Sequence, residues 1–167
     1  MNTDETDLTE NTVKMELLHK DLTDKIIQVF FKVYRELGYG FLEKVYHNAM
    51  LIELNLQGFD CQSQQKINVY YHSREIGEYY SDITVNGLII LELKASEALV
   101  EANENQLINY LRATKCEVGL LFNFGKNPEF RRKIFTNDRK RIIEKAFDSW
   151  KGNNRQIDDV MVIGIKV

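Results

Sequence analysis

The chain has 167 residues, of which 44% are hydrophobic and 28% are charged, and its formal net charge is −3. This composition is typical of a globular protein, and the negative charge argues against a protein that holds nucleic acid by overall charge alone. The two cysteines, Cys61 and Cys116, and the lack of any Cys/His cluster argue against a disulfide framework and against a zinc site. No apolar run approaches the roughly 20 residues that cross a bilayer, and the first residues are polar. We therefore expect a cytoplasmic protein without membrane contact.

Two helices are predicted in the first third of the chain, after a flexible polar leader of residues 1–20. The first covers residues 21–37, where apolar side chains recur at three- and four-residue steps, and it ends at Gly38. The second covers residues 41–57 and ends at Gly58. The side chains expected on its apolar face are Leu42, Val45, Tyr46, Ala49, Met50 and Leu54.

Strands dominate the middle of the chain, where Ile, Val, Tyr and Leu are frequent. They are expected at residues 66–71, 75–85, 88–95 and 117–124. Asn86-Gly87 is a strong hairpin signal between the second and third strands, and residues 101–112 have helical periodicity. Two helices, three strands, a helix and a strand predict an α/β fold with a mixed central sheet flanked by helices.

The end of the chain is predicted to be an accessory tail of residues 140–167. Apolar spacing indicates a helix at residues 141–150, and a run of Val and Ile indicates a strand at residues 159–167. The main domain is therefore expected to cover residues 21–139.

The strand at residues 88–95 carries an unusual charged pair. Because side chains alternate along a strand, Glu92 and Lys94 share one face, and the apolar side chains of Leu91 and Leu93 share the other. Asp82 lies on the preceding strand. Two carboxylates and an ammonium group suit phosphodiester hydrolysis, which needs a hard cation, an attacking water and positive charge for the developing anion. Alternatively, the Glu-x-Lys pair is an ordinary solvated ion pair.

Strand parity makes this hypothesis testable. If Asn86-Gly87 alone formed the turn, Asp82 and Glu92 would lie on opposite faces of the sheet. For the two carboxylates to share a metal, the hairpin needs a three- or five-residue loop, or a bulge, between Thr84 and Ile90.

Two predicted helices carry further polar residues. Glu43 and Tyr46 lie one turn apart on the second helix, and Gln106 and Tyr110 are at positions i and i+4 of the helix at residues 101–112. Taken alone, each pair is also compatible with an ordinary amphipathic helix, with Tyr46 in the core.

These segments together resemble a known family. Gly40-x-x-Glu43-x-x-Tyr46 matches the name-giving motif of the GxxExxY proteins, a branch of the PD-(D/E)XK nuclease superfamily. The resemblance continues, over residues 22–139, through Asp82 and three segments. These are Glu92-Leu93-Lys94-Ala95, Gln106-Leu107-Ile108-Asn109-Tyr110-Leu111 and Val118-Gly119-Leu120-Leu121-Phe122-Asn123-Phe124-Gly125. It implies a PD-(D/E)XK (restriction endonuclease-like) core.

The resemblance also implies roles for individual residues. Glu43, Asp82 and Glu92 would be acidic ligands of Mg²⁺, for which Mn²⁺ could substitute, and the Leu93 carbonyl would add a ligand. Lys94 would be the catalytic lysine and Gln106 a residue that orients the site. Supporting positions are Gly40, Tyr46 and Tyr110. Ser81 stands where the superfamily has a proline, a difference that affects entry into the strand and not the metal chemistry.

The tail has a separate, short resemblance. Residues 150–160 are similar to the end of SpoIIE-type PP2C phosphatases, where paired aspartates matching Asp158 and Asp159 help to bind a metal. One aspartate pair cannot assemble a two-metal centre, so the tail is interpreted as an accessory segment or a fusion remnant.

The sequence thus predicts an Mg²⁺-dependent nuclease that contacts DNA or RNA transiently and that could act as a homodimer. The alternative is a catalytically silent nuclease fold that binds nucleic acid or protein. A basic group could contact phosphate, or could simply be a solvated face. Its members are Lys126, Arg131, Arg132, Lys133, Arg139, Lys140 and Arg141. Tyr79, Tyr80 and His72 could stack on bases, although packing or plain exposure on a strand is the simpler interpretation.

Overall fold

The structure is a computed structural model that describes residues 18–138 and residue 142. The chain divides into two compact units, residues 1–136 and residues 137–167. Most of the predicted leader, all of the predicted tail helix at 141–150 except residue 142, and the tail strand at 159–167 lie outside the described residues. All elements below belong to the first unit.

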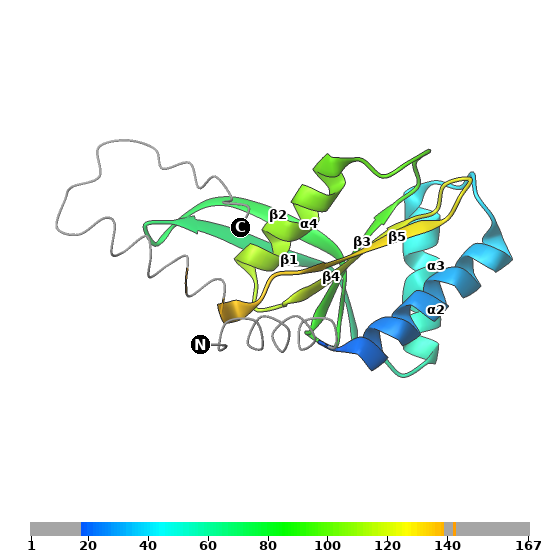
Figure 1. The fold of residues 1–167 in the computed structure, drawn as a ribbon, viewed down its shortest axis with the longest axis horizontal. Coiled ribbons are helices and arrows are strands. Elements are labelled where there is room, and N and C mark those ends of the chain that lie inside the picture. The colour runs from blue at the N-terminus through cyan, green and yellow to red at the C-terminus, as the bar shows by residue number, and fades with distance from the viewer. Residues whose placement is uncertain (1–17, 139–141, 143–167) are drawn as a thin grey trace, which may run out of the picture. The chain divides into compact units, whose positions relative to one another are not determined.

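Three helices and five strands make up the described part of this unit (Figure 1). The helices are α2 (Lys20–Leu37), α3 (Glu43–Leu56) and α4 (Glu101–Ala113). The strands are β1 (Cys61–Tyr71), β2 (Arg74–Val85), β3 (Ile89–Lys94), β4 (Val118–Asn123) and β5 (Glu129–Ile134).

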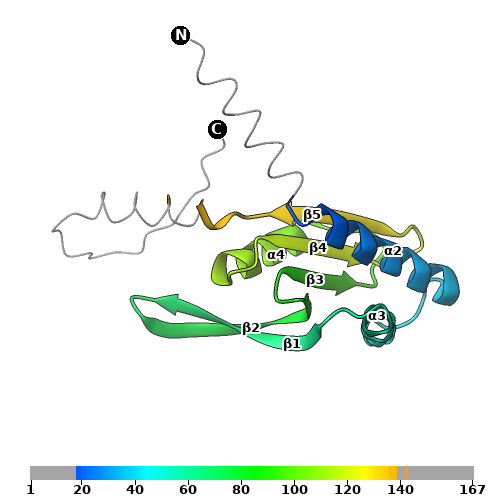
Figure 2. The ribbon, with the colours of Figure 1, turned by 90° about the horizontal axis from the view of Figure 1, so that it is seen from below.

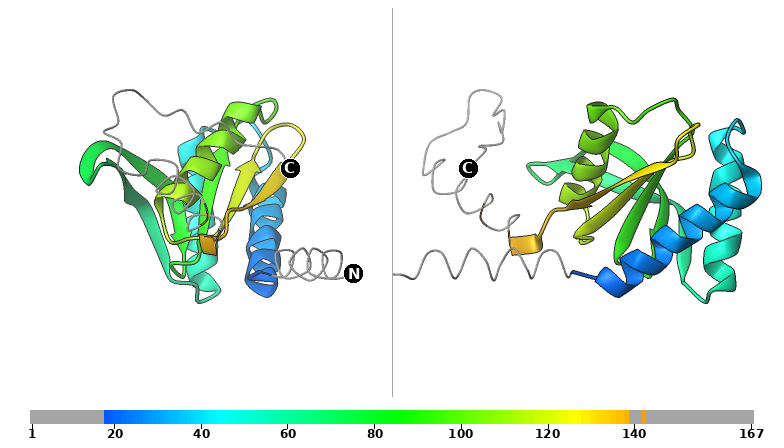
Figure 3. Two further views of the ribbon diagram at one scale, coloured as in Figure 1. Left: turned by 60° about the vertical axis from the view of Figure 1, so that its left-hand side comes forward. Right: turned by 45° about the vertical axis from the view of Figure 1, so that its right-hand side comes forward.

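The strands form one mixed sheet in the order β1-β2-β3-β4-β5. Only β3 and β4 are parallel, and α4 is the crossover between them, since parallel neighbours cannot be joined by a tight turn. Helix α4 covers one face of the sheet, and α2 and α3 cover the other (Figure 3). The predicted α/β fold with a mixed sheet between helices is confirmed.

Alternation along β3 explains the two layers. Leu91 and Leu93 are fully buried in the core under α2 and α3, whereas Ile90 points into a second core under α4. Aromatic rings fill the first core: Phe30 of α2 stacks on Phe122 of β4 with the ring centroids 4.5 Å apart. Burial of such rings is the main favourable term that holds the helices on the sheet.

Two strands differ from the sequence expectation. β1 begins at Cys61 rather than at residue 66, because the polar segment 61–65 pairs with the end of β2 despite its low strand propensity. β5 was not predicted, because its Glu-Phe-Arg-Arg-Lys-Ile sequence is highly charged. Such a composition suits an edge strand, which is the place of β5 in the sheet.

Helix α3 buries a narrower face than its apolar pattern predicted. Tyr46, Met50 and Leu54 are fully buried, as expected. Leu42 and Val45 were expected on the same face, but they are 80% and 38% exposed. The helix packs on the sheet along an i, i+4, i+8 row, and this row leaves Val45 outside it. Leu42 is the extended residue before the first helical turn, so its side chain does not continue the row.

The β1–β2 hairpin extends beyond the ends of β3 and β4 (Figure 2). Its distal part is a two-stranded ribbon with exposed tyrosines, among them Tyr70 and Tyr80. Within the described residues, no helix combines the length and hydropathy needed to cross a bilayer.

Candidate active site

The site begins with the β2–β3 hairpin, whose loop decides which side chains share a face. Val85 pairs with Ile89, so the loop contains three residues rather than two. Asn86 and Gly87 form the expected turn with φ angles of 52° and 65°, and Leu88 is the additional residue. The irregular hairpin that strand parity required is confirmed.

This loop places Asp82 and Glu92 on one face of the sheet, at the point where pairing of the two strands ends. Ile83 pairs with Leu91, and the next step in the same register sets Asp82 opposite Glu92. Beyond this point the Asp82 side chain, and not its backbone, bonds to β3: its Oδ2 accepts a hydrogen bond of 2.7 Å from the Leu93 backbone N–H. One carboxylate oxygen of Asp82 is thereby fixed against β3.

Glu92 is the most buried acidic side chain of the site, with a relative exposure of 2%. Its Oε1 accepts hydrogen bonds from Lys94 Nζ at 2.7 Å and from Gln106 Nε2 at 2.9 Å. Its Oε2 is buried and has no hydrogen-bond partner among the described residues. Buried polar atoms are nearly always paired, so this oxygen marks a position at which a ligand is expected.

The charges around Glu92 change its acidity. Burial, with a further contribution from the negative charge of Asp82, raises the pKa of Glu92 to about 7 against the attraction of Lys94. Burial opposes the charge of Lys94, but the hydrogen bond and the attraction of Glu92 outweigh it, so the pKa of Lys94 is raised. Lys94 is therefore an ammonium ion at neutral pH, and Glu92 changes its charge near neutrality.

Glu43 brings the third carboxylate from the first turn of α3. Burial raises its pKa; Lys94 lowers it and the negative charge of Asp82 raises it, so the three groups are electrostatically coupled. The side chain of Glu43 is nevertheless exposed. Within residues 18–138 and 142, no three acidic, histidine or cysteine side chains are close enough to hold a metal as they stand.

Helix α4 supplies the pair that was predicted from its i, i+4 spacing. Gln106 Nε2 donates to Tyr110 Oη at 2.6 Å as well as to Glu92. Both amide hydrogens of Gln106 are thus used to hold Glu92 and Tyr110 together. The ring of Tyr110 also lies 5.7 Å from that of Tyr79, whose side chain is half exposed on β2.

The supporting residues of the Gly40 motif act on the loop before α3. Tyr46 Oη donates to the Gly38 carbonyl at 2.9 Å and accepts from the Phe41 N–H at 3.2 Å. Gly40 has a φ of +105°, a conformation that favours glycine. These contacts fix the loop immediately before Glu43.

The exit of β3 is also fixed by its surroundings. Asn123, fully buried at the end of β4, donates to the Ser96 carbonyl and accepts from the Ser96 N–H, both at 3.0 Å. A Cβ at Gly125 would lie 2.2 Å from the Ser96 carbonyl oxygen, so this position requires glycine. The segment that follows Lys94 is therefore held firmly against β4.

Comparison with known families decides the identity of this fold. The family model described as PD-(D/E)XK nuclease superfamily matches residues 20–133. The chain belongs to the PD-(D/E)XK nuclease superfamily. Nucleases of this superfamily typically use divalent metal ions.

A solved structure titled "Crystal structure of SSO0001" is similar to this PD-(D/E)XK protein, with a TM-score of 0.47 and 17% sequence identity. The match covers 70% of the present chain and 61% of that chain. No curated protein matches the sequence.

One residue of this PD-(D/E)XK site was missed by the sequence. His47 Nε2 lies 3.0 Å from the Asp82 carbonyl oxygen and 3.1 Å from Ser63 Oγ. The available signal was its position four residues after Glu43, on the same helix face. A histidine at such a position is common, and only the folded structure shows its contact with β2.

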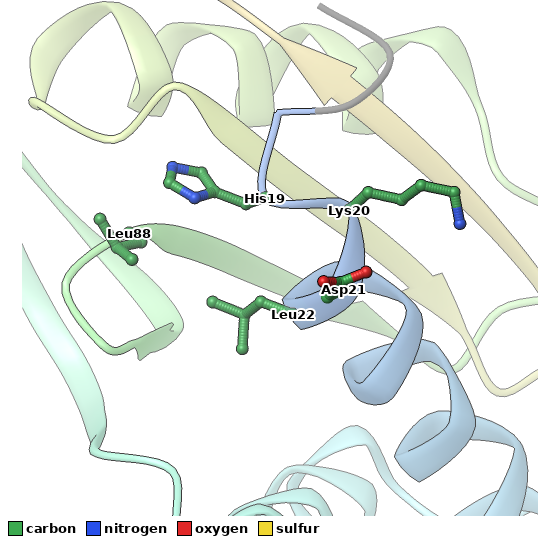
Figure 4. Close-up of a pocket in the computed structure, with 5 residues that line it drawn as sticks. All are labelled: His19, Lys20, Asp21, Leu22 and Leu88. Carbon is green, nitrogen blue, oxygen red and sulfur yellow. The ribbon is translucent and has the colours of Figure 1, made fainter.

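A surface pocket lies elsewhere in the PD-(D/E)XK domain and is not the candidate site. Figure 4 shows its lining residues at the start of α2 and in the β2–β3 loop. They are His19, Lys20, Asp21, Leu22 and Leu88. Leu88 precedes β3, whereas Glu92 and Lys94 are at the other end of that strand. The pocket contains none of the predicted site residues.

The basic group predicted near β5 is largely engaged within the protein. Arg131 and Lys133 form ion pairs with Glu104 of α4, and Arg131 also pairs with Glu129. Arg132 donates to the Leu18 carbonyl at 2.6 Å. The remaining arginines and Lys140 lie outside the described residues. This edge therefore does not present a row of unpaired cations in its described part.

Proposed function

We propose that this chain is an Mg²⁺-dependent nuclease that hydrolyses phosphodiester bonds of DNA or RNA. Membership of the PD-(D/E)XK superfamily supports the general activity. The observation that carries the proposal is the buried Oε2 of Glu92, which has no hydrogen-bond partner in the described part of the chain, on a carboxylate that feels the charges of Asp82, Lys94 and Glu43. A hard divalent cation is the partner that such carboxylate oxygens suit best.

The residues that would hold the cation are Glu43, Asp82 and Glu92, with the Leu93 carbonyl as a further ligand. When bound, Mg²⁺ supplies positive charge for the phosphate and makes a coordinated water more acidic. Two of the carboxylates are already fixed, by the Leu93 N–H and by Lys94 with Gln106. Glu43 is exposed on the first turn of α3, and its carboxylate would have to move to join this ligand set.

The other residues have roles that follow from their contacts. The ammonium group of Lys94 orients Glu92 and provides positive charge where the phosphate becomes more anionic. Gln106 is a positioning residue, since both of its amide hydrogens hold the carboxylate of Glu92 and the hydroxyl of Tyr110. Together they fix Oε1 of Glu92 and leave Oε2 for the cation.

The test is cleavage of labelled single- and double-stranded DNA and RNA with Mg²⁺ or Mn²⁺, and with EDTA as the metal-free control. Two substitutions remove charge with little change of shape: Asp82→Asn keeps an acceptor for the Leu93 N–H, and Lys94→Met keeps the side-chain length. Lys44→Met, on the exposed side of α3, is the matched control. All variants are purified identically, so that a contaminating nuclease would appear in each.

Metal-dependent cleavage that Asp82→Asn and Lys94→Met abolish, and that Lys44→Met retains, is the expected result. Equal cleavage by all four proteins would assign the activity to a contaminant. No cleavage, together with no heat of Mn²⁺ binding by calorimetry, would overturn the nuclease proposal.

The alternative function is a catalytically silent nuclease fold that binds nucleic acid or protein. It is favoured by the lack, within the described residues, of a ready-made group of three metal ligands. The test above separates the two functions, because a silent module would retain binding to nucleic acid or protein without metal-dependent cleavage.

Narrower assignments are also proposals. The Gly40, Glu43 and Tyr46 motif supports placement in the GxxExxY branch. A cytoplasmic location stays a prediction from the composition. The net charge of −3 supports a transient contact with DNA or RNA. A homodimer, which would let two sites act on two strands, and the phosphatase-like interpretation of residues 150–160 stay predictions.

A further inference from the structure

The backbone of the β1–β2 hairpin is irregular at Asp82. Ser63 pairs with Ile83, and Gln65 pairs with Ser81, but the intervening pair of Gln64 with Asp82 is missing. Gln64 has a φ of +50°, which is unusual for a residue with a side chain. Strain of this kind persists only where neighbouring contacts hold the backbone in place.

Alternation along β2 also breaks at this point. Ser81 Oγ and Thr84 Oγ1 are both buried and lie 3.1 Å apart, although residues three apart on a regular strand point to opposite faces. The irregular pairing therefore turns the strand locally around Asp82. A strand that is turned in this way needs a contact from another element to hold its main chain at Asp82.

Helix α3 supplies that contact through His47. Its Nε2 is 3.0 Å from the Asp82 carbonyl oxygen, which can only accept, so Nε2 carries the hydrogen and donates. The nearby Ser63 Oγ, at 3.1 Å, fixes the same ring nitrogen from β1. Asp82 is thus held twice: its side chain by the Leu93 N–H of β3 and its main chain by α3.

The same helix turn carries Glu43. Because residues four apart lie next to each other on a helix, the bond from His47 to Asp82 also sets where Glu43 stands relative to Asp82. We propose that His47 is a positioning residue of the metal site, which holds the Glu43 helix against the Asp82 strand. This inference rests on the proposed function, since it assumes that Glu43 and Asp82 bind one cation.

Two substitutions of equal length isolate the hydrogen bond. His47→Gln retains an N–H donor that can reach the Asp82 carbonyl, and His47→Met fills similar space without a donor. Asn55→Ala is the matched control, because Asn55 is exposed on the same helix about two turns away from His47, whereas the side chain of Asn48 contacts the His47 ring. Affinity for MnCl2 alone is measured by titration calorimetry on the full chain. Circular dichroism establishes that each protein is folded, and kcat and KM are measured separately.

We expect His47→Met to weaken Mn²⁺ binding by about 10–100-fold, as loss of a contact behind a metal ligand usually does. His47→Gln should recover most of this affinity, and Asn55→Ala should match the wild type. The loss of activity in His47→Met should appear in kcat more than in KM, because the proposed role of His47 involves no contact with the substrate. If the role of His47 were purely structural, both His47 variants would be less stable, and His47→Gln and His47→Met would bind Mn²⁺ with the same affinity.

Equal Mn²⁺ affinity of His47→Met and wild type would overturn the inference while leaving the nuclease proposal intact. Failure of the wild type itself both to bind Mn²⁺ and to cleave would overturn both. The two failures are therefore distinguishable in one series of titrations.

Discussion

The protonation of Glu92 should make the stability of the metal-free protein depend on pH. Burial, next to Asp82, raises the pKa of Glu92 from 4.5 to about 7. This rise of about 2.5 pH units corresponds to about 3 kcal/mol, at 1.36 kcal/mol for each unit. The folded protein binds the extra proton between these pH values, so the free energy of unfolding falls as pH rises from 4.5 through 7.

The substitution Glu92→Gln removes this dependence. Glutamine is neutral at every pH, has the same shape as the protonated carboxyl group and keeps an acceptor for Lys94 and Gln106. We expect the difference in free energy of unfolding, variant minus wild type, to increase by about 3 kcal/mol from pH 4.5 to pH 8. This increase does not depend on the value of the difference at low pH. The difference at low pH reflects the buried amide hydrogens that replace Oε2.

The assay is urea denaturation in EDTA, followed by circular dichroism at half-unit steps from pH 4.5 to pH 8. Glu97→Gln is the matched control, because it removes one carboxylate that is exposed to solvent. A difference between Glu92→Gln and wild type that stays constant within about 0.5 kcal/mol across this range would refute the reasoning. It would mean that Glu92 is ionised in the folded protein well below neutrality.

Three further outcomes are expected. Gly125→Ala should lower the free energy of unfolding by about 1–3 kcal/mol in urea denaturation, because the new Cβ meets the Ser96 carbonyl oxygen; a neutral substitution would contradict this. Tyr46→Phe should lower it by about 1–2 kcal/mol in the same assay, because the Gly38 carbonyl and the Phe41 N–H lose a partner; an unchanged urea midpoint would speak against it. Mg²⁺ should raise the melting temperature more at pH 8 than at pH 6 in a thermal scan, because ionised Glu92 binds the cation; equal shifts would argue against Glu92 as a ligand.

The order of the elements could be predicted from the sequence because it depends on local patterns. The helical spacing of Ile26, Phe30 and Val33 places hydrophobic side chains on one side of α2, and the continuous apolar run of β3 predicts a strand buried on both faces. Charged β5 lacks such a pattern, and its pairing with β4 is decided by the sheet edge that β4 offers. The same holds for residues 61–65, which become a strand only through β2.

The candidate site, like the fold, was predictable from the sequence only in part. The alternation of Glu92 and Lys94, the spacing of Gln106 and Tyr110, and the requirement for a longer hairpin loop all follow from strand and helix periodicity. The sequence by itself therefore determined which of these side chains share a face. Only the tertiary structure decided what they touch: the Leu93 N–H that holds Asp82, the lack of a partner for Glu92 Oε2 among residues 18–138 and 142, and the contact of His47 with β2. Periodicity acts within one element, whereas these contacts join elements that are distant in the chain and depend on how helices and sheet pack.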